Sequence, residues 1–375
     1  MDSKPSQTAN MSESVGISLS GGGIRALTFH LGVIKFLAEA GIWEDIKIVS
    51  SVSGGSLAVA LVFALNKGRW PSSADFVTML DGPVRTTLTQ FDLQQEIYRR
   101  LLLKPWMIFR PRANVLAEVL RAVWGLHQNL QDLPDIPAIQ INCTTYETGK
   151  NWRFSKERMG DYITGYITKP SISLAHAVSA SAAYPGLIGP LRMKTKAFEH
   201  VASSYGDQER KAQIAEKNIW LWDGGVYENL GVESLHKNRN LQKNLEFLLV
   251  SDASGQLGVE TRRWSLSFPY FLAPYRLMNI AMDQTRALRA RDLLATFIED
   301  RSKGRYVYIA NSVPQIYQRA KKEVPPEFQH LSDDEVKRCS HFPTNLKKLT
   351  ISDLDMLVRH GYEVSKATLD AYSMP

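Results

Sequence analysis

Residues 20–25 read Ser-Gly-Gly-Gly-Ile-Arg, and residues 51–55 read Ser-Val-Ser-Gly-Gly. Each stretch follows a short apolar run typical of a β-strand, at 15–19 and 46–50, and opens a segment with helical periodicity. Two successive strand–turn–helix joints predict strands of one parallel sheet, with both turns at its carboxyl edge. Open α/β sheets bind ligands at that edge, so we expect the two turns to face one site.

The rest of the chain continues the alternation of strands and helices. Further strand patterns lie at 138–145, 152–155, 219–222, 247–251 and 306–310, and helix patterns lie at 24–40, 54–66, 173–183, 275–300 and from 352 onward. This order predicts an α/β fold, specifically a three-layer α/β/α sandwich with a mostly parallel central sheet.

The expected domain organisation follows from the same patterns. Residues 1–14 are polar and are expected to form a flexible tail, and residues 15–375 a single catalytic domain. A helical insertion is expected at about residues 72–130. A helical C-terminal region is expected at about residues 265–375.

Composition limits the class of protein. The 375 residues are 44% hydrophobic and can bury a large core, and the only two cysteines, Cys143 and Cys339, indicate a reducing compartment. Residues 1–14 lack the features of a secretory signal, and the longest apolar run, 57–65, is shorter than the about 20 residues that span a bilayer. We therefore expect a cytoplasmic protein that reaches lipid from the inner face of the membrane. A net charge of +7 favours an anionic partner, either a membrane surface or a nucleic acid.

The serine turn has the pattern of a nucleophile elbow, in which a cramped turn holds a serine hydroxyl above the sheet. Ser53 is therefore the candidate nucleophile. Attack on an acyl carbonyl creates an anion that needs positioned donors, and the backbone amides of Gly22 and Gly23 are the candidate oxyanion hole.

The glycine turn has a second interpretation. Residues 21–26 also fit the G-x-G-x-x-G/A pattern of a dinucleotide-binding loop after a strand. Such a site needs an acidic residue at the end of the next strand to bind the ribose, and Ser50 and Ser51 stand there instead. A dinucleotide-dependent oxidoreductase is therefore the less favoured alternative.

The base that activates Ser53 is a carboxylate or a histidine. Asp223 ends an apolar strand pattern and precedes two glycines, which places it at another turn of the sheet edge. His236, His341 and His360 come late enough for a Ser-Asp-His triad. In the α/β-hydrolase fold, however, the serine follows several strands, whereas Ser53 follows only the second, which weighs against the triad.

These motifs together resemble the patatin-like phospholipases, and the likeness runs from about residue 15 to residue 252. It rests on the glycine loop with Arg25, the elbow serine, the Asp-Gly-Gly motif at 223–225, the Ala-Ser-Ala-Ala-Tyr-Pro stretch at 180–185 and the run at 142–149. The stretch at 341–344 with 360–362 is similar to bacterial members. Three positions depart from the family pattern: Ser20, Ala26 and Ser51. Ser51 replaces the first glycine of G-x-S-x-G.

The resemblance implies a lipid acyl hydrolase that releases fatty acids from phospholipids or other acyl esters through a Ser53–Asp223 dyad and an acyl-enzyme. It implies an oxyanion hole at Gly22 and Gly23 and neither metal nor cofactor. It assigns supporting roles to Gly21, Arg25, Gly55, Gly224 and Gly225. Arg25 steadies the loop or attracts a phosphate head group. The departure at Ser51 leaves a second hypothesis, a catalytically silent protein that binds lipid or nucleotide. The sequence does not indicate the oligomeric state.

Two stretches are candidates for contact with an anionic membrane. In residues 98–112, basic side chains flank aliphatic and aromatic ones. Residues 264–278, which include Tyr275, are apolar and aromatic and could also line a groove for an acyl chain. Core packing explains either stretch equally well. Arg286, Arg289 and Arg291 lie on a predicted helix without a nucleic-acid motif, so we interpret them as a solvated face and expect no nucleic acid partner.

Overall fold

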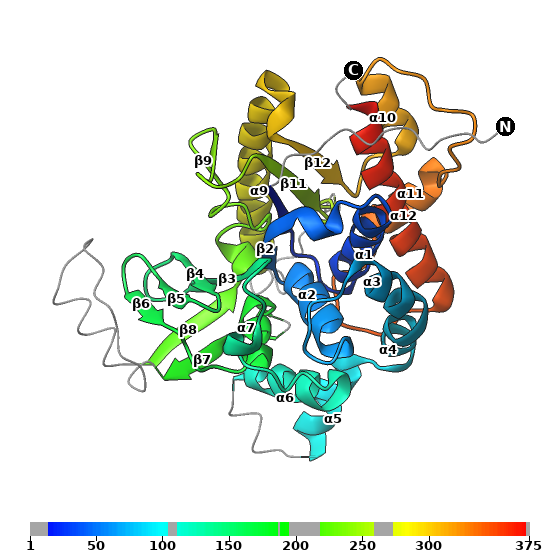
Figure 1. Ribbon diagram of the computed structural model, residues 1–375. Coiled ribbons are helices and arrows are strands. Elements are labelled where there is room, and N and C mark those ends of the chain that lie inside the picture. Colours follow the sequence, from blue (N-terminus) through cyan, green and yellow to red (C-terminus); the bar gives the residue numbers. More distant parts are fainter. Residues whose placement is uncertain (1–13, 104–110, 187, 195–217, 259–272, 373–375) are drawn as a thin grey trace.

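The computed structural model describes residues 14–103, 111–186, 188–194, 218–258 and 273–372 (Figure 1). Its centre is one mixed sheet with the strand order β12 (Gly304–Tyr308), β11 (Phe247–Asp252), β1 (Val15–Leu19), β2 (Ile46–Val52), β3 (Ala138–Thr145), β4 (Asn151–Phe154), β5 (Arg158–Asp161) and β6 (Gly165–Thr168). The five strands from β12 to β3 are parallel, and the strands beyond β3 are antiparallel. The short strands β9 (His236–Lys237) and β10 (Asn240–Leu241) pair separately.

Helices cover both faces of the parallel strands. α1 (Gly23–Glu39), α2 (Gly54–Leu65), α7 (Leu174–Ser181) and α12 (Ile351–Ala371) contribute to the larger core, and α9 (Ala273–Glu299) contributes to a second, smaller one. The side chains of β11 alternate between the two, because Leu249 belongs to the larger core and Leu248 and Val250 to the smaller. The predicted three-layer α/β/α fold is confirmed (Figure 1).

The remaining helices flank these layers. Within residues 72–130 lie α3 (Ser73–Met79), η2 (Leu80–Val84), α4 (Arg85–Gln90), α5 (Leu93–Leu103) and α6 (Arg112–Trp124). Toward the C-terminus lie α10 (Val313–Arg319) and α11 (Asp333–Ser340), which precede α12. Among the described residues, every helix is too short or too polar to cross a bilayer.

One strand runs against the expected direction. β8 (Asn218–Asp223) pairs antiparallel with β3 and with β7 (Leu191–Lys194), although the alternation of elements predicted a parallel strand. β3 is longer than β2, so its last residues, 143–145, extend past β2 and pair with β8. β4 occupies the other edge of β3, so β2 and β8 lie end to end along one edge. Their carboxyl ends therefore meet.

Candidate active site

A pocket of about 380 Å³ opens where these strand ends meet. Its walls include the glycine turn after β1, the elbow after β2, the end of β8, residues of α9 and residues 340–346. Of the residues predicted from sequence, the following line it: Gly21, Gly22, Gly23, Arg25, Ser53 and Asp223. The pocket lining does not include Gly55, Gly224 or Gly225. Gly55 and Gly224 pack against the backbone of neighbouring strands, and Gly225 packs against the side chains of Asn229 and Asp223.

Ser53 lies at a strained turn. Its φ is 50° and its ψ is −112°, which places a non-glycine residue in a conformation that L-amino acids rarely adopt. The Ser53 amide donates to Ser181 Oγ at 2.9 Å, and Ser181 Oγ donates to the Asn142 carbonyl at 2.7 Å. α7 and β3 thus hold the elbow in place, and Ser53 is 8% exposed at the pocket wall.

The turn needs glycines because two backbones approach it closely. A Cβ at position 54 would lie 2.4 Å from the Gly23 carbonyl oxygen, and one at Gly55 would lie 2.3 Å from the Leu19 carbonyl oxygen. No side chain fits in either place without moving a strand or the glycine turn. The elbow and the glycine turn therefore pack directly on one another.

Serine is accommodated at position 51, where the family pattern has glycine. Ser51 is fully buried, and its Oγ lies 2.9 Å from Ser56 Oγ and 3.2 Å from the Gln140 carbonyl oxygen. Ser56 Oγ lies 2.9 Å from Ser181 Oγ, so the three hydroxyl groups form a chain beneath the elbow. The extra hydroxyl group has partners, and the turn keeps its shape.

The glycine turn presents two backbone amides. Gly22 has φ 145° and Gly23 has φ 60°, and α1 begins there without an acidic residue in its first turn. The amide of Gly21 donates to the Asn229 carbonyl at 3.0 Å. Within the described part of the chain, the Gly22 and Gly23 amides donate to no acceptor. Two donors and the positive end of α1 are therefore available to an anion in the pocket.

The C-terminal region closes the far side of the glycine turn. The Ile24 amide donates to the Asn345 carbonyl at 2.9 Å, and a Cβ at Gly23 would lie 2.6 Å from that oxygen. The motif at 341–344 was noticed in the sequence, but no contact with the glycine turn was inferred. No local pattern signals that contact, because more than 300 residues separate the two segments.

Arg25 supports the turn rather than reaching into solvent. Its Nε donates to the Ala253 carbonyl at 3.1 Å, and its Nη1 donates to the Phe342 carbonyl at 2.6 Å and to Thr344 Oγ1 at 3.0 Å. Burial lowers the pKa of Arg25 to about 10, which still leaves it protonated near neutral pH. Of the two expected roles, these contacts match the one that steadies the loop.

Asp223 is a buried carboxylate with one unused oxygen. Its Oδ1 accepts from the Gly225 amide at 2.8 Å, and its Oδ2 has no hydrogen-bond partner among the described residues. Burial raises the pKa of Asp223 to about 7, and the nearby Ser53 hydroxyl and the Gly225 amide oppose that rise. No hydrogen bond of normal geometry joins Asp223 to Ser53, whose side chain faces the same pocket.

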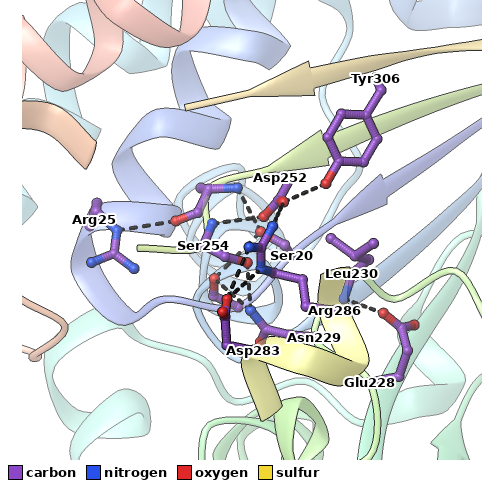
Figure 2. Close-up of polar contacts among 12 residues, drawn as sticks. Ser20, Arg25, Glu228, Asn229, Leu230, Asp252, Ser254, Asp283, Arg286 and Tyr306 are labelled. Atoms are coloured by element: carbon purple, nitrogen blue, oxygen red, sulfur yellow. Dashed lines mark hydrogen bonds and ion pairs between the residues drawn. The ribbon is translucent and has the colours of Figure 1, made fainter. Parts of the chain in front are cut away.

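The turn after Asp223 is as tightly packed as the elbow. A Cβ at Gly224 would lie 2.4 Å from the Asn142 carbonyl oxygen, and one at Gly225 would lie 2.6 Å from Asn229 Oδ1. Asn229 Nδ2 donates to Ser254 Oγ at 2.7 Å (Figure 2). The asparagine thus packs between the glycine turn and the Asp223 turn.

The three late histidines differ in position. His236 Nε2 lies 3.0 Å from Thr296 Oγ1, and His360 Nε2 lies 2.6 Å from the Ile309 carbonyl oxygen, both outside the pocket lining. His341 does line the pocket, with its Nδ1 2.9 Å from the Lys337 carbonyl oxygen. Of the three, only His341 reaches the walls of this pocket.

Tyr275 of α9 lines the pocket, within the stretch expected to line an acyl groove, but sequence reasoning missed the position of Arg286 on the same helix. Arg286 lines the pocket and forms ion pairs of 2.9 Å with Asp252 and with Asp283 (Figure 2). Arg289 forms an ion pair with Glu233. The prediction of a solvated arginine face is therefore wrong for Arg286 and Arg289, because both guanidinium groups form ion pairs, Arg286 with Asp252 at the end of β11 and Arg289 with Glu233. Helical spacing alone did not reveal which acids would lie opposite.

The described ranges contain no group of three or more His, Cys, Asp or Glu residues suited to hold an ion. Cys143 and Cys339 are both buried and free. Burial raises the pKa of each thiol, so neither is an activated nucleophile.

Comparisons with known proteins found relatives in sequence and in structure. A family model described as patatin-like phospholipase matches residues 17–236, more than half of the chain. A patatin-like phospholipase domain-containing protein of Chaetomium globosum is 24% identical over 254 residues, which are 65% of this chain and 25% of that protein. The solved structure of human GIVD cytosolic phospholipase A2 has a TM-score of 0.51 and 15% identity, with 96% of this chain and 62% of the other covered.

A further solved structure, VipD from Legionella pneumophila, has a TM-score of 0.39 and 14% identity, with 96% of this chain and 67% of the other covered. The likeness to the human protein shows a shared fold. The chain spans a quarter of the length of the curated relative and less than two thirds of the human structure.

Proposed function

The chain belongs to the patatin-like phospholipase family, and from this premise we propose that it is a lipid acyl hydrolase that cleaves carboxylic ester bonds of membrane phospholipids and releases fatty acids. One observation carries the proposal. A strained serine shares a pocket with a carboxylate and two backbone amides, and neither the Asp223 Oδ2 nor these amides have a hydrogen-bond partner among the described residues. This is the set of groups that acyl transfer through a serine requires.

The first half-reaction forms an acyl-enzyme. The Asp223 carboxylate takes the hydroxyl proton of Ser53 while Oγ attacks the ester carbonyl carbon. The amides of Gly22 and Gly23 donate to the oxyanion that develops, and the positive end of α1 adds to its stabilisation. When the intermediate collapses, the alcohol oxygen leaves with the proton from Asp223, and the acyl group stays on Ser53.

The second half-reaction reverses these roles. Asp223 takes a proton from water, and the hydroxide oxygen attacks the acyl carbon. The oxyanion again lies against the Gly22 and Gly23 amides. Collapse returns the proton to Ser53 Oγ and releases the fatty acid. The strained elbow helps because it holds Oγ in one position throughout.

The pocket lining suits an acyl chain. Apolar and aromatic side chains surround the catalytic groups: Tyr184, Ile188, Leu257, Tyr275, Met282 and Leu346. An ester with a long acyl chain buries that chain against these side chains, whereas a polar substrate gains nothing from them. This lining favours lipid esters over small polar esters.

The contacts of Ser50 and Ser51 on β2 weigh against the two alternatives, a dinucleotide-dependent oxidoreductase and a catalytically silent binder. Ser50 Oγ donates to the Gly231 carbonyl, and Ser51 Oγ contacts Ser56 and Gln140, so neither hydroxyl group is free to bind a ribose. The hypothesis of a catalytically silent binder depended on Ser51 disturbing the turn, and Ser51 fits the turn. If the native chain releases no fatty acid, the result favours a catalytically silent protein that binds lipid or nucleotide.

Release of fatty acid tests the proposed function. We expect the purified chain to release free fatty acid from phospholipid vesicles and to cleave long-chain nitrophenyl esters faster than acetyl esters, because of the apolar lining. Mass spectrometry of the lipid products measures the first, and absorbance measures the second. Absence of release from every phospholipid and neutral lipid offered would contradict the proposal.

We also propose that the end of α5 contacts an anionic membrane. Leu102 is 79% exposed and Leu103 is 64% exposed, and Tyr98 lies one turn before Leu102. Arg99 and Arg100 both pair with Glu96, at 2.7 and 2.9 Å, so part of their charge is neutralised. Exposed leucines beside basic residues suit insertion among lipid head groups. Residues 104–110 and 259–272, which include most of the other predicted contacts, lie outside the described residues.

Aspartates at positions 102 and 103 should weaken vesicle binding. The double variant Leu102→Asp with Leu103→Asp is expected to lower co-sedimentation with anionic vesicles about tenfold or more, because two apolar contacts are replaced by like charge. The matched control is Ile351→Asp, which changes a residue 60% exposed at the start of α12. Equal binding of the native chain and the double variant would contradict the role of α5.

A further inference from the structure

A second pocket, of about 440 Å³, lies away from the candidate active site. Its walls come from the amino ends of β2 and β3, from β4 to β6 and from the segment after β10. None of its lining residues lines the first pocket. Lys47 of this pocket precedes Ser53 by six residues along β2, a separation of about 20 Å in an extended strand.

Cations dominate the second pocket. The charged residues in its lining are Lys47, Arg153, Lys156, Arg158, Asp135 and Glu157. Lys156 pairs with Asp135 at 2.8 Å, and Arg158 lies over the Tyr166 ring at 4.5 Å from its centre. Lys47, Arg153 and Arg158 have no ion-pair partner among the described residues, and Glu157 is the one carboxylate of the lining left to offset them.

Arg153 is the unusual member of this set. Its Nε is buried and has no hydrogen-bond partner in the described part of the chain. Trp152 and Phe154, its neighbours on β4, face the core, so Arg153 points to the opposite face of the sheet. Across the ladder it lies opposite Gly160, which offers no side chain to cover it. A buried N–H donor without a partner costs free energy unless something binds it.

Burial also lowers the pKa of Arg153, with the neighbouring Arg158 acting in the same direction and Tyr166, Glu233 and Tyr227 against it. Glu233 is already paired with Arg289 and with Lys237. Among the described residues, no carboxylate therefore forms an ion pair with Arg153. An anion in the pocket would relieve the desolvation of this guanidinium.

We propose that Arg153, Lys47 and Arg158 form a binding site for a phosphate monoester. The guanidinium fork of Arg153 matches two phosphate oxygens, while Lys47 and Arg158 add charge at the rim. A dianion suits three cations better than a monocarboxylate does. The neutral side chains Gln242 and Asn244 line the same pocket and can donate to further oxygens. The phosphate belongs to a soluble ester or to the head group of phosphatidic acid.

Calorimetric titration of the full chain with inorganic phosphate and with pyrophosphate tests the site. We expect one saturable site, with the affinity falling about tenfold or more in Arg153→Gln and by a smaller factor in Lys47→Gln. Arg192→Gln is the matched control, because Arg192 lies over the Trp220 ring outside the pocket. It should bind as the native chain does.

Vesicle co-sedimentation separates the two sources of phosphate. Binding to inorganic phosphate and pyrophosphate that depends on Arg153 supports a soluble ester. Binding dependent on Arg153 only to phosphatidylcholine vesicles that contain phosphatidic acid supports the head group. Unchanged binding of every probe by both Arg153→Gln and Lys47→Gln, or no binding by the native chain, would overturn the site.

Two further measurements keep the result interpretable. Arg153→Gln should have a melting temperature equal to or above that of the native chain without phosphate, because it removes a charged group whose buried Nε has no partner among the described residues. If that variant does not fold, Lys47→Gln on the exposed rim still reports the site. Ser53→Ala should retain phosphate binding, so failure of the proposed hydrolysis and failure of this site are distinguishable.

Discussion

Replacement of Ser53 by alanine is expected to lower kcat for ester hydrolysis by about four orders of magnitude, because the proposed acyl-enzyme forms on its hydroxyl oxygen. The structure predicts little effect on KM, since the apolar lining and the two free amides remain. Single-turnover kinetics with a nitrophenyl ester measures the loss. Labelling by a fluorophosphonate, which requires the serine oxygen, should disappear in parallel.

The control for this variant is Ser179→Ala. Ser179 is also a buried serine of the same core, and its hydroxyl has no hydrogen-bond partner among the described residues. Its removal should leave kcat and labelling unchanged. A Ser53→Ala variant that stays folded and hydrolyses esters at the native rate would rule out Ser53 as the nucleophile.

The pH dependence of hydrolysis is expected to follow Asp223. A base must be deprotonated to act, and burial raises the pKa of Asp223 to about 7. The value of kcat/KM should therefore rise about tenfold per pH unit below pH 7 and level off above it. Asp223→Asn should lose activity by several orders of magnitude at every pH, because an amide cannot accept the proton.

The same carboxyl group should destabilise the fold at high pH. Its pKa rises from 3.8 in the unfolded chain to about 7 in the folded one, so between these values the folded chain holds a proton that the unfolded chain has lost. Stability therefore falls as pH rises from about 4 to about 7 and stays low above that range. Asp223→Asn removes this cost, with an upper limit of about 4 kcal/mol at pH 8.

Denaturant unfolding at pH 4 and pH 8 measures this effect. The Asp223→Asn variant should exceed the native chain in stability at pH 8 and approach it at pH 4. Asp161→Asn is the matched control, because Asp161 is equally buried but accepts from Thr145, Thr148, Ile163 and Thr164. The Asp161→Asn variant should be less stable than the native chain. The midpoint of its kcat/KM dependence on pH should be unchanged. A profile without a transition near pH 7 would argue against Asp223 as the base.

Much of the fold could be predicted because its signals are local. The strand at 15–19, the strand at 138–145 and the helix at 54–66 depend on apolar periodicity within a few residues, and their observed bounds agree within about two residues. The glycine turn and the elbow were also local signals, since each needs backbone angles that few residues adopt. Gly22, Gly23 and Ser53 do have positive φ.

The direction of β8 could not be predicted in this way. Strand patterns carry no information on direction, and the alternation of elements favoured a parallel strand. Asp223 was expected near Ser53 because both follow strands, but it reaches the pocket from the opposite direction. The overhang of β3 past β2 makes this possible, and that overhang depends on pairing between segments about 80 residues apart.

The sequence by itself determined the two turns, since glycine and a small elbow residue are needed wherever backbones meet so closely and φ is positive. Only the tertiary structure decided their chemistry. It brought the carboxyl ends of β2 and β8 together, buried Asp223 so that its pKa lies near neutrality, and placed Asn345 against the glycine turn. Conformational limits act within a few residues of chain, whereas burial and electrostatics depend on which distant segments fold into contact.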